Sequence, residues 1–66
     1  RCNAMCPGGV ENGQPEEFLK EVSYRIPMGR LAQENEYQGT LLWMLSEASS
    51  YLNGAIIPID GGRTAW

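Results

Sequence analysis

The chain has 66 residues, an apolar fraction of 42%, and a net charge of −3 from 8 acidic and 5 basic side chains. The basic residues are scattered, which argues against a nucleic-acid-binding surface, and no apolar run reaches the ~18 residues needed to span a bilayer. A folded protein is expected, but one near the lower size limit for a domain with its own core.

Residues 1–5 predict the end of a strand, and an opening on Arg1 rather than Met suggests a piece of a longer protein. Cys2 and Cys6 would lie with Ala4 on one face of that strand, because side chains alternate. Two alternatives are open for the cysteines: half of a metal site, or buried reduced thiols. With no His and no third Cys in the chain, the thiols are favoured and no metal is expected.

A loop is predicted over residues 7–14, at the carboxyl end of this strand. Pro7 is expected to stop the strand because it has no N–H for the ladder. Gly8 and Gly9 allow a sharp turn or the close approach of a ligand, and Asn12-Gly13 is a second turn signal.

A short helix is expected to follow, with Pro15 at its first position and two acids in its first turn. Its apolar stripe comprises Phe18, Leu19, Val22 and Ile26. The helix must end before Pro27, since the residue before a proline avoids helical geometry.

A second helix is predicted from Glu34 to Glu47, with the stripe Tyr37, Leu41, Met44, Leu45 and Ala48 on one face. Leu42 and Trp43 lie off that stripe, so the helix is expected to have a second buried side. Gly39 costs ~1 kcal/mol relative to Ala in a helix, and either marks a close contact with a neighbour or is merely tolerated.

The last strand is predicted from Ala55 to Ile59, as a short apolar run bounded by Asn53-Gly54 and Asp60-Gly61-Gly62. Continuous apolar residues suit a strand covered on both faces. Pro58 favours an edge position. The tail, residues 63–66, is expected to be a brief extension.

The order strand, loop, helix, helix, strand predicts a crossover unit whose two strands are parallel. In such α/β sheets ligands bind beyond the carboxyl ends of the strands, which is where the loop after Pro7 lies. A Pro-Gly-Gly loop alone is weak support for a site.

Four segments then carry a family resemblance: residues 3–10 (Asn-Ala-Met-Cys-Pro-Gly-Gly-Val), 26–30 (Ile-Pro-Met-Gly-Arg), 49–54 (Ser-Ser-Tyr-Leu-Asn-Gly) and 59–62 (Ile-Asp-Gly-Gly). In this order and spacing the chain resembles the C-terminal part of a short-chain dehydrogenase/reductase. The resemblance implies an α/β fold, in which residues 1–66 form the last strand–loop–helix–helix–strand part of one doubly wound, parallel, Rossmann-type NAD(P)-binding domain.

By that resemblance, the loop formed by Pro7, Gly8, Gly9, Val10 and Asn12 borders the nicotinamide end of NAD or NADP. The backbone groups of Val10 would meet the carboxamide; Asn12 stands where the family usually has a contacting threonine. Residues 13–30 resemble the mobile substrate loop, with Phe18, Leu19, Val22 and Tyr24 as candidate substrate contacts, although each of these side chains alone is more readily explained by packing.

The resemblance implies an NAD(P)-dependent oxidoreductase acting on an alcohol, ketone or sugar-like small molecule. It places the family's glycine-rich turn and catalytic Ser, Tyr and Lys upstream of Arg1, so the 66 residues alone are expected to be inactive. Subunit contacts through the last helix and last strand imply a homo-oligomer, with neither nucleic acid nor membrane as a partner. Reduced thiols suit a cytoplasmic protein. The alternative is a truncated, non-catalytic module that docks onto a full-length subunit.

Overall fold

A computed structural model describes residues 1–65; Trp66, the end of the predicted tail, lies outside the described residues. Strand β1 (Ala4–Pro7) is followed by helix α1 (Glu16–Tyr24), and a 3₁₀ helix (Glu34–Tyr37) leads directly into helix α2 (Gln38–Leu45). A second 3₁₀ helix (Glu47–Ser49), strand β2 (Ile56–Ile59) and a third 3₁₀ helix (Arg63–Ala65) complete the order. Both predicted helices and both predicted strands are confirmed, with α1 starting one residue after Pro15, which is its N-cap rather than its first residue.

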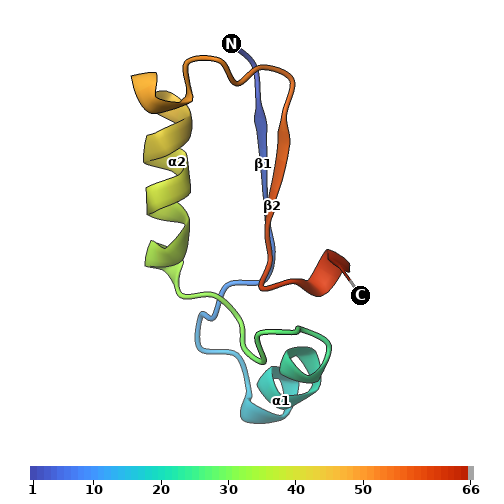
Figure 1. Ribbon diagram of the computed structural model, residues 1–66. Coiled ribbons are helices and arrows are strands. Elements are labelled where there is room, and N and C mark those ends of the chain that lie inside the picture. Colours follow the sequence, from blue (N-terminus) through green and yellow to red (C-terminus); the bar gives the residue numbers. More distant parts are fainter. Residues whose placement is uncertain (66) are drawn as a thin grey trace.

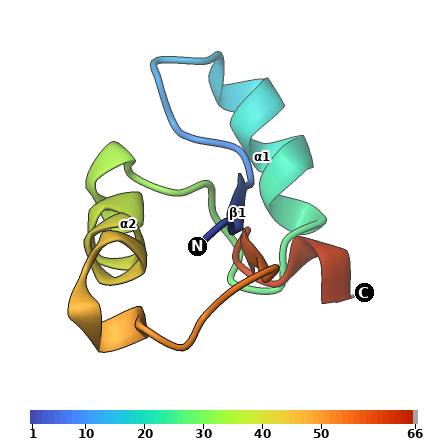
Figure 2. The ribbon, with the colours of Figure 1, turned by 90° about the horizontal axis from the view of Figure 1, so that it is seen from above.

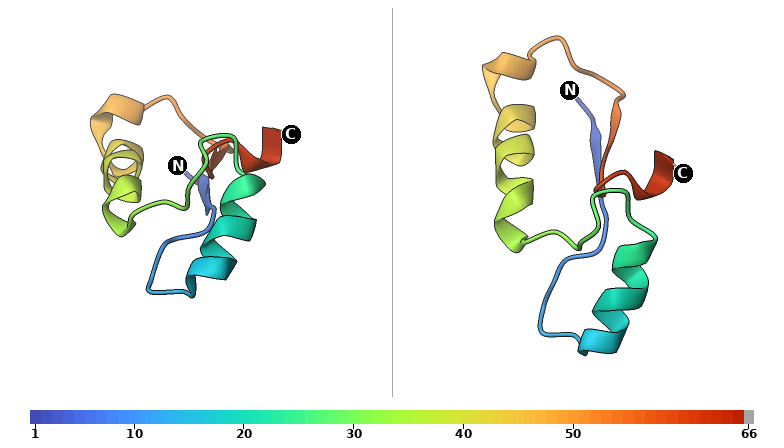
Figure 3. Two further views of the ribbon diagram at one scale, coloured as in Figure 1. Left: turned by 90° about the horizontal axis from the view of Figure 1, so that it is seen from below. Right: turned by 60° about the horizontal axis from the view of Figure 1, so that its bottom comes forward.

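The two strands are parallel, as predicted, with Ala4 opposite Ile56 and Pro7 opposite Ile59. The chain leaves β1 at its carboxyl end and passes through α1, which lies beyond the strand ends. It then returns along α2, which runs alongside the two strands on one face of the sheet (Figure 1). α1 and the start of β2 are thus at opposite ends of the strands, and the carboxyl ends of β1 and β2 face α1 (Figure 3).

β1 ends at Pro7, as predicted, but Pro7 is the last residue paired in the strand rather than the first residue beyond it. Ala4 N–H and Gly8 N–H donate to the Ala55 and Ile59 carbonyls at 2.8 and 2.9 Å. In a parallel ladder, alternate residues bond to the same neighbour, so the missing N–H groups of Pro7 and Pro58 both fall on the sides of the strands that face away from the partner. Neither proline removes a hydrogen bond from this ladder, and Pro58 has the place expected in an edge strand.

The sheet is covered on one face only. Met5, Ile57 and Ile59 are half-buried on the face toward α2, whereas Ala4, Cys6 and Pro58 are exposed on the other face, with Ile56 74% exposed. Cys2 and Cys6 are both exposed, so the prediction of buried thiols on a packed face was wrong for the described chain. The cause is that, among residues 1–65, no element lies over that face (Figure 2).

Among the described residues, the two buried apolar side chains lie at the carboxyl ends of the strands, not between helix and sheet. They are Ile26 and Leu31, at 4% and 5% exposure. Neither α1 nor α2 has a buried residue, and Leu41 and Leu45 are 46% and 75% exposed. The predicted apolar stripes are therefore only partly covered within residues 1–65: Ile26 is buried, whereas Phe18, Leu41 and Leu45 are exposed. A Cβ on Gly39 would meet nothing within 4 Å there, so no close neighbour of Gly39 is found in the described part of the chain.

Polar side chains join the opposite end of the sheet to the end of α2. The Asn3 amide nitrogen donates to the Leu52 carbonyl at 3.1 Å, and its oxygen accepts from Ala55 N–H at 2.9 Å. The hydroxyl of Ser49, 4% exposed, donates to the Trp43 carbonyl at 2.7 Å. These bonds satisfy groups left unpaired at the helix end and hold the connection to β2 against the start of β1.

Candidate functional site

The two glycines after β1 are packed closely against the rest of the chain. A Cβ on Gly8 would lie 2.8 Å from the Asp60 Cβ and 2.9 Å from its Cα, and one on Gly9 would lie 2.8 Å from the Leu31 Cδ2. The space next to these two α-carbons is thus filled by the end of β2 and by the connector after α1. Their small size is required for this internal contact, whatever else binds nearby.

Beyond the glycines, the loop is held in an extended course beside the connector. Val10 forms a parallel bridge with Ala32, in which Ala32 N–H donates to the Gly9 carbonyl at 3.0 Å and Glu11 N–H donates to the Ala32 carbonyl at 2.8 Å. Val10 itself is half-buried.

Gln14, which sequence reasoning missed, closes this loop from its far side. Its amide nitrogen donates to the Val10 carbonyl at 3.0 Å, and its oxygen accepts from Asn12 N–H at 2.6 Å. Within residues 1–65, the N–H of Val10 and the side chain of Asn12 bond to no other protein group. The loop therefore presents a backbone donor and an amide side chain that remain available to a bound molecule.

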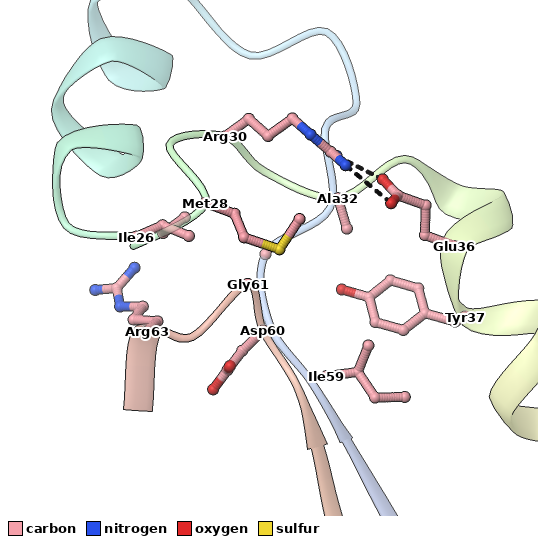
Figure 4. Close-up of a pocket in the computed structure, with 11 residues that line it drawn as sticks. Ile26, Met28, Arg30, Ala32, Glu36, Tyr37, Ile59, Asp60, Gly61 and Arg63 are labelled. Atoms are coloured by element: carbon pink, nitrogen blue, oxygen red, sulfur yellow. Dashed lines mark hydrogen bonds and ion pairs between the residues drawn. The ribbon is translucent and has the colours of Figure 1, made fainter. Parts of the chain in front are cut away.

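A cavity of about 110 Å³ opens at the carboxyl ends of the strands. It is formed by three segments: the loop after β1, the connector between α1 and α2, and the turn after β2 (Figure 4). The residues that line it are Gly9, Ile26, Met28, Arg30, Ala32, Glu36, Tyr37, Ile59, Asp60, Gly61 and Arg63. Of the predicted cofactor residues, only Gly9 lines this cavity, although the Tyr37 hydroxyl lies 3.3 Å from the Gly8 carbonyl to which it donates.

The predicted substrate-contact residues all lie on α1, outside this cavity. Phe18 and Tyr24 are 48% and 86% exposed, and Leu19 and Val22 are half-buried. α1 lies beyond the carboxyl ends of the strands (Figure 3). This is the side on which ligands bind in parallel sheets, but the described residues show no cleft between these side chains and the cavity.

Arg30 and Glu36 form a bidentate ion pair at one edge of the cavity (Figure 4). Its two hydrogen bonds measure 2.6 Å from Arg30 Nη1 to Glu36 Oε1 and 3.0 Å from Nη2 to Oε2, and Gln33 N–H donates to Glu36 Oε1 at 2.9 Å. The hydrogen bond from Arg30, followed by that from Gln33, lowers the pKa of Glu36 from 4.5 to about 2. Sequence reasoning did not select this pair, although Gln33 and Glu36 have the spacing of a capping box.

Replacement of Glu36 by Gln is expected to reduce stability in a pH-dependent way. Because the folded-state pKa of Glu36 is depressed, its contribution is fully present above pH 4.5 and is lost as the pH falls toward 2. Urea unfolding at pH 7 and pH 3 should therefore give a larger deficit for Glu36→Gln at pH 7. Glu34→Gln, on the same 3₁₀ helix but outside any ion pair among residues 1–65, is the control; a Glu36→Gln deficit that stays constant with pH would contradict this account.

Asp60 organises the turn after β2 rather than offering a free base to the cavity. Its carboxylate accepts from Gly62 N–H at 2.9 Å and from the Thr64 hydroxyl and N–H at 2.6 and 3.2 Å. The Thr64 hydroxyl is the largest cause of the lowered pKa of Asp60. The segment after Gly62, expected to be a brief tail, forms a 3₁₀ helix (Arg63–Ala65).

The part of the chain that the structure describes contains no group of three or more His, Cys, Asp or Glu side chains arranged to hold a metal ion. Within the same residues, no helix has both the length and the apolarity that a membrane crossing requires.

Comparisons with known proteins agree on one family. Residues 1–64 match the family model described as enoyl-(acyl carrier protein) reductase. The chain is 39% identical over 69 residues to meso-2,3-butanediol dehydrogenase of Serratia marcescens, covering 98% of this chain and 28% of that protein. It is 37% identical to L-rhamnose-1-dehydrogenase of Scheffersomyces stipitis, covering 94% of this chain and 26% of that protein.

Solved structures give the same result. A short-chain dehydrogenase of Leptospira borgpetersenii with bound NAD⁺ superposes with a TM-score of 0.92 at 33% identity, over 97% of this chain and 25% of that one. A gluconate 5-dehydrogenase of Burkholderia cenocepacia, in complex with NADP and tartrate, gives 0.90 at 29% identity, over 100% of this chain and 28% of that one. The chain thus spans little more than a quarter of the length of these proteins.

Proposed function

The chain belongs to the short-chain dehydrogenase/reductase family, and from this premise we propose that it is the C-terminal part of an NAD(P)-dependent oxidoreductase. In this proposal residues 1–66 are the end of one Rossmann-type domain. The glycine-rich turn and the catalytic Ser, Tyr and Lys of the family are supplied by the preceding part of the full-length protein. The reaction is hydride transfer between a nicotinamide and a small alcohol or ketone.

The observation that carries the proposal is the pair of available groups on the loop after β1. The Val10 N–H and the Asn12 side chain have no protein partner within the described residues, and Gln14 holds the loop in place beside them. A nicotinamide carboxamide needs such a donor, fixed at the carboxyl end of a strand. Pro7, Gly8 and Gly9 position this donor, because Pro7 ends β1 and the glycines pack on Asp60 and Leu31.

The cofactor is NAD or NADP, in keeping with the two relatives that hold one or the other. Residues 13–30 are proposed as the substrate lid, in which Phe18, Leu19, Val22 and Tyr24 meet the substrate when α1 closes and water is excluded. A polyol or sugar-like substrate is supported by the names of relatives that act on butanediol, rhamnose and gluconate.

A homo-oligomer is proposed through α2 with its flanking turns and through β2. Leu42, Leu45 and Ile56 are 68%, 75% and 74% exposed in the described chain, with Trp43 beside them at 40%. Apolar surface of this kind commonly marks a protein interface. A cytoplasmic location is proposed from the unpaired thiols of Cys2 and Cys6.

The cofactor role of the loop is tested by Asn12→Ala in the full-length protein. Loss of one hydrogen bond of about 1 kcal/mol is expected to weaken NAD(P)H binding roughly fivefold, with thermal stability unchanged, because this side chain has no partner among residues 1–65. Asn12→Thr, which restores the usual family residue, should bind at least as tightly as the wild type.

Asn35→Ala is the matched control, since Asn35 is an exposed asparagine on the 3₁₀ helix (Glu34–Tyr37), away from the cavity lining. Cofactor fluorescence titration gives the dissociation constants. Equal affinities for wild type and Asn12→Ala would remove Asn12 from the cofactor site.

A further inference from the structure

The segment directly after the C-terminal end of α1, residues 26–28, is held by the turn that follows β2. Met28 N–H donates to the Gly61 carbonyl at 3.0 Å. A Cβ on Gly61 would lie 2.8 Å from the Ile26 Cγ2, and one on Gly62 would lie 2.9 Å from the Pro27 Cγ. Ile26 is one of the two buried apolar side chains of the described chain, at 4% exposure, and Figure 4 shows it beside Gly61 with Met28.

Ile26 is the buried apolar side chain closest to α1 along the chain. The helix ends at Tyr24 and has no buried residue of its own. One exposed ion pair lies within it and a second joins it to Arg25, and such exposed pairs contribute little to stability. Arg25 and Ile26 continue from α1 through bonds from their N–H groups to the Val22 and Ser23 carbonyls. The position of Ile26 therefore fixes where the helix emerges.

We propose that Gly61 is a positioning residue of the substrate lid: the turn after β2, at the far end of the sequence, sets the pose of α1 by contact with Ile26. The assignment of residues 13–30 as a lid rests on the proposed function, whereas the contact itself does not. The turn after β2 thus contacts a segment more than thirty residues earlier in the chain. Only a residue without a Cβ at position 61 can lie this close to Ile26.

Gly61 also has a positive φ of 66°, which any side chain would strain. Gly29 separates this backbone effect from the contact, because its φ is 77° and a Cβ on it would meet nothing within 4 Å among the described residues. Gly29→Ala introduces the same kind of strain in the same connector without the collision.

The test compares Gly61→Ala, Gly29→Ala and the double variant Gly61→Ala with Ile26→Leu in the full-length protein. Leucine keeps the volume of Ile26 but has no Cγ2, so it removes the colliding atom. Hydrogen exchange of residues 16–24 and steady-state kinetics are measured on each variant.

Gly61→Ala should speed exchange of α1 by about tenfold. It should also raise KM for the substrate, with cofactor affinity within about twofold of the wild type. Gly29→Ala should leave α1 exchange at the wild-type rate, and the double variant should return both exchange and KM toward it.

Equal effects of Gly61→Ala and Gly29→Ala, or no rescue by Ile26→Leu, would overturn the proposal. Should Gly61→Ala fail to fold, Ile26→Ala removes the same contact without adding atoms, and unchanged α1 exchange in that variant would be equally contrary. A full-length protein that shows no NAD(P)-dependent activity would remove the proposed function alone, because the exchange comparison still decides whether Gly61 positions α1.

Discussion

Gly8→Ala is expected to lower the free energy of unfolding of the full-length protein by about 3 kcal/mol, at the upper end of the usual cost of an overpacked site. The added Cβ would lie 2.8 and 2.9 Å from the Cβ and Cα of Asp60, and these atoms cannot rotate away as the end of a side chain can. The backbone must move instead, which strains the 2.9 Å hydrogen bond from Gly8 N–H to the Ile59 carbonyl. Urea denaturation followed by tryptophan fluorescence measures the loss.

Gly9→Ala is the matched control on the neighbouring residue. Its Cβ would come closer than 3 Å only to the Cδ2 of Leu31, the end of a side chain that can change rotamer, so a smaller loss of about 1 kcal/mol is expected. Equal losses for the two variants, or a loss for Gly8→Ala below ~0.5 kcal/mol, would show that the contact between the loop and β2 is not as close as described.

Leu42→Ser is expected to dissociate the proposed homo-oligomer of the full-length protein into smaller species. Leu42 is 68% exposed on α2 and lies next to Trp43, and removal of a leucine from a buried interface costs about 2–5 kcal/mol on the scale of core substitutions. Because both copies lose the side chain in a symmetric contact, the association constant should fall by several powers of ten. Light scattering coupled to size exclusion measures the molar mass.

Phe18→Ser removes an apolar side chain of comparable exposure, 48%, from α1, which lies beyond the strand ends and apart from α2 (Figure 1). It should leave the oligomer intact and affect substrate binding instead. An unchanged molar mass for Leu42→Ser would place the subunit contact elsewhere.

The sequence predicts the order of elements and the parallel pairing because turn residues separate them clearly. Asn12-Gly13, Pro27, Asn53-Gly54 and Asp60-Gly61-Gly62 all fall between observed elements. The sequence predicts the end of the strand at Pro7 but not that Pro7 itself pairs with β2. Whether a proline interrupts a ladder depends on which side of the strand its nitrogen faces, and that is known only once the register with β2 is known.

The sequence predicts the burial of the helices and the lining of the cavity less well, because both depend on which separate parts of the protein meet in space. An apolar stripe such as that on α2 indicates a covered face but not what covers it, and within residues 1–65 it remains largely exposed. The cavity is lined by residues from three separate segments. The Arg30–Glu36 ion pair lies at its edge, and the residue types alone did not predict that these two side chains would pair. The family resemblance indicates the cofactor residues, and the structure adds Gln14, which holds the loop on which Val10 and Asn12 lie.

We infer that this chain completes an NAD(P)-binding site to which the preceding part of the protein contributes the glycine-rich turn. Isothermal titration of NADH and NADPH into the full-length protein and into the isolated 66 residues tests it most directly. The full-length protein is expected to bind at least one cofactor saturably, with one site per subunit, and the 66 residues alone are expected to show no measurable binding. Absence of binding to the full-length protein, or equally tight binding to the isolated chain, would contradict it.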